Sequence, residues 1–272
     1  MTNEIKEKLG SELSVAIEKE LEELKKSDRM LLSDIVAVVK RSDALFGKPK
    51  EDCDDSKESI YAIFNPSRYS FACTKDFGAK RNKNSNIVLM SFNYFIEQVL
   101  EFNFTYLTLL QSQTFYQTMQ FEKLGNLLNV MLYKDYHKDD YGYFWTDYNV
   151  GKALYRKLVS LMLGVLGDVQ KGKFKEPEQL EAREFLLFVV IQVASKLVWS
   201  GYKNFSLVDC IDYDKYRLFR SQSKEIRIRD LCSDVDSLNR LQDFEFDKED
   251  AFEFTITTKF KFMQDIAIAK LY

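Results

Sequence analysis

Apolar residues recur every three or four positions along the first 26 residues, and Glu and Lys fill the positions between them. Residues three and four apart share one face of a helix, so this spacing predicts an amphipathic helix over residues 3–26. The same spacing returns over residues 31–39, and Asp28 is placed to cap that second segment. We therefore expect an N-terminal helical hairpin over residues 1–46.

The next segment, residues 47–58, has almost no apolar side chains and a dense acidic centre. This composition is typical of a linker or surface loop, and it separates the hairpin from a body over residues 59–272. Residues 59–74 alternate between apolar and polar on both sides of Asn65-Pro66. The alternation predicts two short strands joined by a turn.

Helical spacing dominates the middle of the chain, over residues 87–136, 154–169 and 177–199. The first of these segments is long for a single helix, which favours a break near Thr114 or Gly125. The third begins with Pro177, a residue suited to a first helical turn. Its apolar part is too short and too polar to cross a bilayer, so we expect a buried central helix.

Alternation reappears in the C-terminal third, over residues 225–231, 243–247 and 252–262. A period of two predicts strands with one buried face, paired in an antiparallel sheet. The predicted fold is therefore α+β. It has a large helical body, an N-terminal helical hairpin, and a small antiparallel sheet formed by residues 59–74 and the C-terminal third.

Composition, charge and cysteine spacing indicate the kind of protein and its cellular compartment. Apolar residues make up 46% of the 272 positions and charged residues 30%, which is typical of a globular protein. The net charge of −3 argues against a dedicated nucleic-acid binder, which normally carries a basic excess. The four cysteines form no C-x-x-C pair, and the charged N-terminal segment does not resemble a signal peptide. We expect a soluble cytoplasmic protein with reduced thiols and no membrane association.

The single histidine, His137, excludes sites that require two or more histidines, including H-E-x-x-H metalloproteases and HD-type phosphohydrolases. The chain also lacks a G-x-S-x-G nucleophile elbow and both common glycine-rich nucleotide motifs. We therefore expect no cofactor, and an enzyme is the less favoured class.

One alternative keeps an enzymatic function open. In a strand, Asp212 and Asp214 would point to the same face, and two such carboxylates can hold Mg²⁺. This arrangement would suit a divergent metal-dependent enzyme that acts on nucleotides or nucleic acid.

The favoured candidate site is the stretch YKDYHKDDYGYFWTDY, residues 133–148, which is rich in aromatic rings and aspartates. Tyr and Trp combine an apolar ring with a polar group and are favoured in protein interfaces. The residues assigned to binding here are Tyr136, His137, Tyr141, Tyr143 and Trp145. The competing interpretation is a loop whose rings cover neighbouring helices.

A second candidate is the basic segment 75–86, in which Lys80, Arg81 and Lys83 lie near Gly78. It is suited to phosphate or to an acidic partner, although such charges also serve simply to keep a connecting loop solvated. Residues 224–229 would extend this basic surface if they folded next to it.

Together these features favour a protein-interaction factor, acting as a regulator, adaptor or inhibitor, whose partner is another protein. The N-terminal apolar stripe also leaves a homo-oligomer open. Nucleic acid is disfavoured as a partner and stays open only through residues 75–83.

Overall fold

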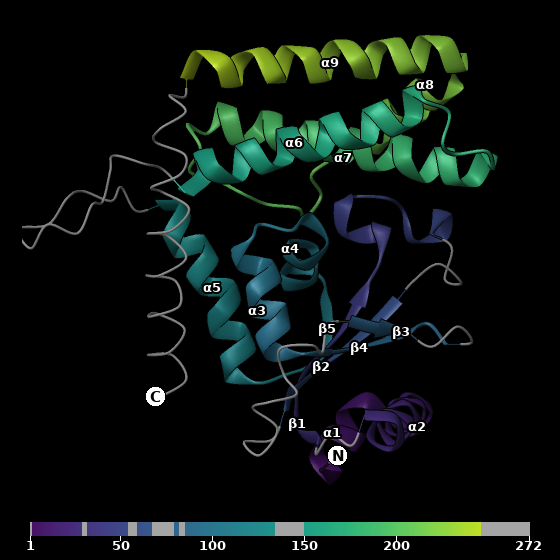
Figure 1. Cartoon of the computed structure of the whole chain (residues 1–272), viewed down its shortest axis with the longest axis vertical. Helices are drawn as coiled ribbons and strands as arrows, with labels where there is room; N and C mark the ends of the chain where they lie inside the picture. The colour runs from purple at the N-terminus through teal and green to yellow at the C-terminus, as the bar shows by residue number, and fades with distance from the viewer. Residues whose placement is uncertain are drawn as a thin grey trace, which may run out of the picture. The chain divides into compact units, whose positions relative to one another are not determined.

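The computed structural model describes residues 2–28, 32–53, 59–66, 79–81, 85–133 and 150–245, and its elements are drawn in Figure 1. The described residues divide into two compact units, of which the first lies within residues 2–45 and 50–126 and the second within residues 46–49 and 127–245. The boundaries predicted at residues 46 and 58 stay a prediction. The α+β class is confirmed, because the described residues form nine α-helices and one five-stranded sheet.

The first unit is built on a mixed sheet with the strand order β3-β4-β2-β1-β5. Its strands are β1 (Leu32–Arg41), β2 (Ser59–Pro66), β3 (Ala79–Arg81), β4 (Ile87–Ser91) and β5 (Gln113–Gln117). Strands β2 and β4 run parallel, and the other neighbours pair antiparallel. The sheet is therefore not the antiparallel one that the sequence pattern predicted. The C-terminal third contributes no strand through residue 245, and the strand predicted over 252–262 lies outside the described residues.

Helices cover both faces of this sheet (Figure 1). Helices α1 (Asn3–Leu9) and α2 (Ser11–Asp28) pack on one face, where Ile5 and Ile17 join Ala62 and Phe64 in one apolar cluster. Helices α3 (Phe92–Leu100) and α4 (Phe104–Gln111) contact strands β1, β2 and β4, and α5 (Met119–Tyr133) follows β5. A strand covered on both faces is apolar at successive positions rather than at alternate ones.

Burial on both faces explains why the second helix of the predicted hairpin is wrong and why its residues form strand β1. Residues 35–39 are all buried in β1, so their apolar run lacks the period of two that marks a half-exposed strand. The N-terminal region does contain two helices, but they divide at Gly10, whose φ of +78° ends α1. The same effect hides β4, where all five residues are buried and where the sequence pattern predicted helix.

Two other predicted features of the first unit have mixed outcomes. The strand predicted at the start of 59–74 is β2, but its partners are β1 and β4, and residues 67–74 lie outside the described part. The break predicted near Thr114 exists, because β5 separates α4 from α5. The alternative break at Gly125 is wrong, since that glycine lies inside α5.

The second unit is helical in its described part. Its helices are α6 (Val150–Gln170), α7 (Pro177–Trp199), α8 (Tyr213–Ser221) and α9 (Lys224–Glu245). Helices α6, α7 and α9 contact one another (Figure 1). Helices α6 and α7 confirm the predictions over 154–169 and 177–199, and Pro177 occupies the first turn of α7 as expected.

The strand predicted over residues 225–231 is wrong, because these residues form the first turns of α9. The buried residues that decide this are Leu231, Val235 and Leu238, at spacings of four and three. Residues 243–245 also belong to α9, so the strand predicted over 243–247 is wrong there. The strand predicted over 252–262 lies outside the described residues.

Among the described helices, none is both long and apolar enough to cross a membrane.

Candidate functional site

Most residues of the favoured binding site cannot be placed. Tyr136, His137, Tyr141, Tyr143 and Trp145 all lie outside the described residues, as does Lys83. Their assignment to binding stays a prediction.

Lys80 and Arg81 are placed on the short strand β3, and both side chains are exposed. The Arg81 guanidinium donates from Nε to the carbonyl of Ser85 at 3.4 Å. The basic residues at 224–229 belong to the second unit, where Arg227 is mostly buried in a polar network rather than displayed on a surface. Lys80 and Arg81 are thus the candidate basic residues that lie exposed in the first unit.

Asp212 and Asp214 lie at the N-terminus of α8 and not in a strand. The Asp212 carboxylate accepts a hydrogen bond from the Lys215 backbone N–H at 3.2 Å and lies 3.5 Å from the Lys215 ammonium. These contacts hold the pKa of Asp212 below its ordinary value, with the backbone hydrogen bond as the larger cause. Asp212 is therefore a helix cap. Across the described part of the chain, no group of three or more His, Cys, Asp or Glu is arranged to hold a metal ion.

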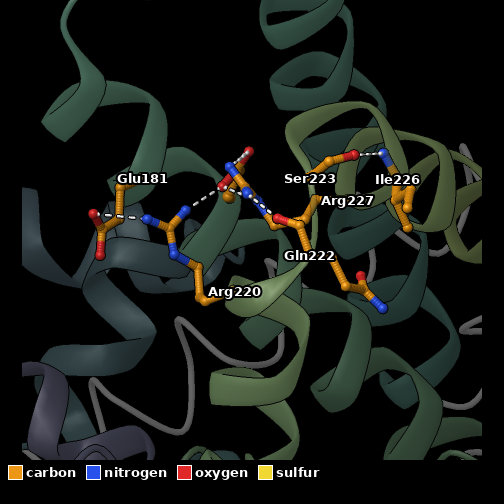
Figure 2. A network of polar contacts seen from close by, with 7 residues as sticks. Glu181, Arg220, Gln222, Ser223, Ile226 and Arg227 are labelled. Atoms are coloured by element: carbon orange, nitrogen blue, oxygen red, sulfur yellow. Dashed lines mark hydrogen bonds and ion pairs between the residues drawn. The ribbon is translucent and has the colours of Figure 1, made fainter.

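The most buried charge in the described part of the second unit is Glu184 of α7, which is fully buried. Its Oε2 lies 2.6 Å from Arg220 Nη1 of α8 and 3.1 Å from Arg227 Nε of α9, and its Oε1 accepts from Arg227 Nη2 at 3.3 Å. Arg220 also reaches Glu181, and Arg227 donates to the Gln222 carbonyl at 2.7 Å (Figure 2). Two carboxylates and two guanidinium groups thus balance each other's charge.

This network joins α8 and α9 to α7, so its role is architectural. A buried carboxylate that keeps its charge needs this many donors, because desolvation costs several kcal/mol per ion. Sequence reasoning missed the network because Arg220 and Arg227 follow Glu184 by 36 and 43 residues, and no local spacing connects them. In the sequence, Ile226, Arg227 and Ile228 show only an apolar–polar alternation, and this alternation predicted a strand.

A different kind of feature lies at the C-terminal end of α7. Trp199, the last residue of that helix, has 89% of its surface exposed. Indole is the largest apolar side chain and is strongly buried on average, so this exposure is unusual. Val208, in the loop that follows, is also exposed, at 52%.

The loop from Ser200 to Asp212 is tightly anchored beside this tryptophan. The backbone N–H of Tyr202 donates to the carbonyl of Leu197 at 2.8 Å, and the N–H of Asn204 donates to Ser200 Oγ at 3.0 Å. The Tyr202 ring is buried edge-on against Tyr155, with 5.6 Å between centroids. Tyr202 holds a left-handed backbone conformation, with φ of 65°, which a bulky residue keeps only where its surroundings enforce it.

Lys196 of α7 is also exposed. Its ammonium donates to the carbonyl of Asp209 at 3.5 Å, so it approaches the residue directly after Val208. Lys196 also lies three positions before Trp199 and therefore on the same side of α7. Trp199, Val208 and Lys196 are all exposed, and we call these three residues the α7 end surface.

No family model, curated protein or solved structure matches the chain.

Proposed function

We propose that this chain is a protein-interaction factor, acting as a regulator, adaptor or inhibitor, and that it binds its partner through the α7 end surface. The observation that supports this proposal is the 89% exposure of Trp199. Tryptophan is enriched among the residues that contribute most of the binding free energy in protein interfaces. Leaving an indole in water has a free-energy cost that burial in a partner would remove.

The anchoring of the loop supports the same proposal. Backbone hydrogen bonds and the Tyr202–Tyr155 contact fix the loop beside Trp199, so binding requires little additional ordering. A surface that is already ordered loses less conformational entropy on association. A preformed aromatic anchor is therefore better suited to recognition than a flexible one.

The charges around the surface indicate the chemistry of the partner. Lys196 lies within it, Lys203 is exposed on the adjoining loop, and Lys152 stacks over the Tyr202 ring at 5.7 Å. A complementary surface would have an apolar pocket for the indole and carboxylates at its rim. We therefore expect a partner protein with an acidic rim around an apolar depression.

Site-specific photo-cross-linking in cells of the natural host tests this proposal. A photoreactive phenylalanine analogue is placed at position 199 of the full chain and, as a control, at Met119, an equally apolar residue of the first unit that is 66% exposed. The proposal expects a protein adduct at position 199 that is absent at position 119. Matching adducts at both positions, or no adduct at position 199, would overturn the proposal. An adduct with a second copy of the chain would overturn the proposed acidic partner and show that the α7 end surface mediates self-association.

The predicted loop of residues 133–148 belongs to the same proposal as a second recognition element. The alternative of a metal-dependent enzyme receives no support from the described residues, because Asp212 caps a helix and pairs with Lys215.

A further inference from the structure

The first unit contains a cavity of about 210 Å³ at the end of β1. It is lined by Lys40, Ser42, Ala44, Leu45, Lys50, Cys53, Ser112 and Gln113. Lys40 and Gln113 are register partners on β1 and β5, and the others come from the turns after β1 and from the residue before β5. Three separate segments, residues 40–45, 50–53 and 112–113, thus meet at one opening.

The lining residues favour an anion. Lys40 and Lys50 supply two ammonium groups, and no carboxylate belongs to the lining. The acidic side chains Asp43, Glu51 and Asp52 lie on the same turns but are exposed and do not line the cavity. An ammonium group donates up to three hydrogen bonds and accepts none, so two of them select an oxygen-rich negative ligand.

The neutral lining groups can add donors to the two lysines. Ser42 Oγ accepts a hydrogen bond from the Ala44 N–H at 3.2 Å, which leaves its own proton available for donation. Gln113 supplies an amide N–H₂ group. Ser112 instead donates to the carbonyl of Thr108 at 2.7 Å, so its hydroxyl is committed and shapes the wall.

The size of the cavity limits the ligand. A water molecule occupies about 30 Å³ in the liquid, and sites for drug-sized ligands begin near 300 Å³. A cavity of about 210 Å³ therefore suits a single tetrahedral oxyanion with a short organic stem. We propose that this cavity binds a phosphate group, either as inorganic phosphate or on a small phosphomonoester, with Lys40 and Lys50 as its charged ligands.

Equilibrium dialysis of the full chain with labelled inorganic phosphate tests this site, and phosphoserine in a parallel arm distinguishes a phosphomonoester from the free ion. Lys50→Gln removes one charge at an exposed position, so it preserves the fold, which circular dichroism checks. Lys19→Gln, at an exposed position of α2, is the matched control. Because a charge-assisted hydrogen bond to an oxyanion is among the stronger kinds, Lys50→Gln is expected to raise the Kd about tenfold or more, while Lys19→Gln leaves it unchanged.

Alkylation of Cys53 shows whether the bound phosphate occupies this cavity. Cys53 lines it and Cys232 lies in the second unit, and both thiols are half-buried. Phosphate is expected to slow N-ethylmaleimide modification of Cys53 but not of Cys232, compared with chloride at equal ionic strength. Absence of phosphate binding, equal binding by the two lysine variants, or equal slowing at both cysteines would overturn the proposal. If Cys53 does not react at all, the dialysis comparison decides alone.

Discussion

Arg227 and Glu184 form a two-pronged ion pair in which Nε meets Oε2 at 3.1 Å and Nη2 meets Oε1 at 3.3 Å. The carboxylate is fully buried and the guanidinium nearly so. Paired donors on a rigid planar group fix both the distance and the orientation of their acceptor. The pair therefore determines how α9 is placed along α7.

Breaking this pair should destabilise the second unit strongly. Arg227→Met leaves the buried Glu184 carboxylate with fewer donors, and removing one partner of a buried ion pair typically costs about 3–5 kcal/mol. Glu181→Gln is the matched control, because Glu181 pairs with Arg220 at the surface and such pairs contribute at most about 1 kcal/mol. Urea unfolding followed by circular dichroism measures both. Equal losses in the two variants would contradict the architectural role of Glu184.

Substitution of Gly47 by alanine should lower the free energy of unfolding. Its φ of +102° is unfavourable for other residues, and an added Cβ would lie 3.1 Å from the backbone carbonyl oxygen of Ile211. The neighbouring hydrogen bond from the Ile211 N–H to the Phe46 carbonyl, 3.0 Å long, keeps these segments from separating. Gly47→Ala is expected to cost about 1–3 kcal/mol in the free energy of unfolding.

Gly167 is the control for Gly47. It lies inside α6 with nothing within 4 Å of an added Cβ, so Gly167→Ala should stabilise the chain by up to about 1 kcal/mol. Thermal unfolding of the two variants side by side gives the comparison. A neutral Gly47→Ala would contradict the close approach of residues 47 and 211.

Burial raises the pKa of the Cys210 thiol to about 12. The native protein should therefore leave Cys210 unmodified at about pH 8, while Cys232 reacts with maleimide. Peptide mapping after brief alkylation measures this difference. Modification of Cys210 at the same rate as Cys232 would contradict its burial.

The same thiol should affect stability at alkaline pH. A folded-state pKa above the ordinary value of 9.0 contributes stability below pH 9 that is lost as the pH rises toward 12. Between about pH 8 and pH 10.5, the wild type should lose about 1–2 kcal/mol more than Cys210→Ala. Urea midpoints at the two pH values test the sign, and a larger loss in Cys210→Ala would contradict it.

The predicted aromatic loop can be tested without knowledge of its structure. Tyr143→Ala combined with Trp145→Ala should abolish partner capture with little change in unfolding free energy, because interface rings contribute to binding more than to folding. A large fall in stability would instead assign these rings to the core.

The sequence predicted the helices of the second unit better than the sheet of the first, and burial explains the difference. In α6 the apolar residues Leu154, Leu158 and Val165 fall on one face, so the helical period is visible. Residues 35–39 of β1 and all five residues of β4 are buried, because helices cover both faces, and a continuous apolar run cannot be told from a helix by its period.

The candidate sites were harder to predict than the fold. The prediction that Asp212 lies in a strand is wrong, and its side chain type is also a common helix N-cap. The Glu184 network, the exposed Trp199 and the cavity at Lys40 depend on residues that are distant in sequence. Tertiary packing alone brings them together or leaves them exposed.

The affinity of the cross-linked partner, once purified, is the most direct test of the proposed function. Isothermal titration calorimetry would compare the wild type with Trp199→Ala and with Met119→Ala, whose side chain is comparably exposed on the other unit. An interface anchor typically contributes at least about 2 kcal/mol, so the Kd for Trp199→Ala should rise about thirtyfold while that for Met119→Ala stays within about threefold of the wild type. An unchanged Kd for Trp199→Ala would contradict binding through the α7 end surface.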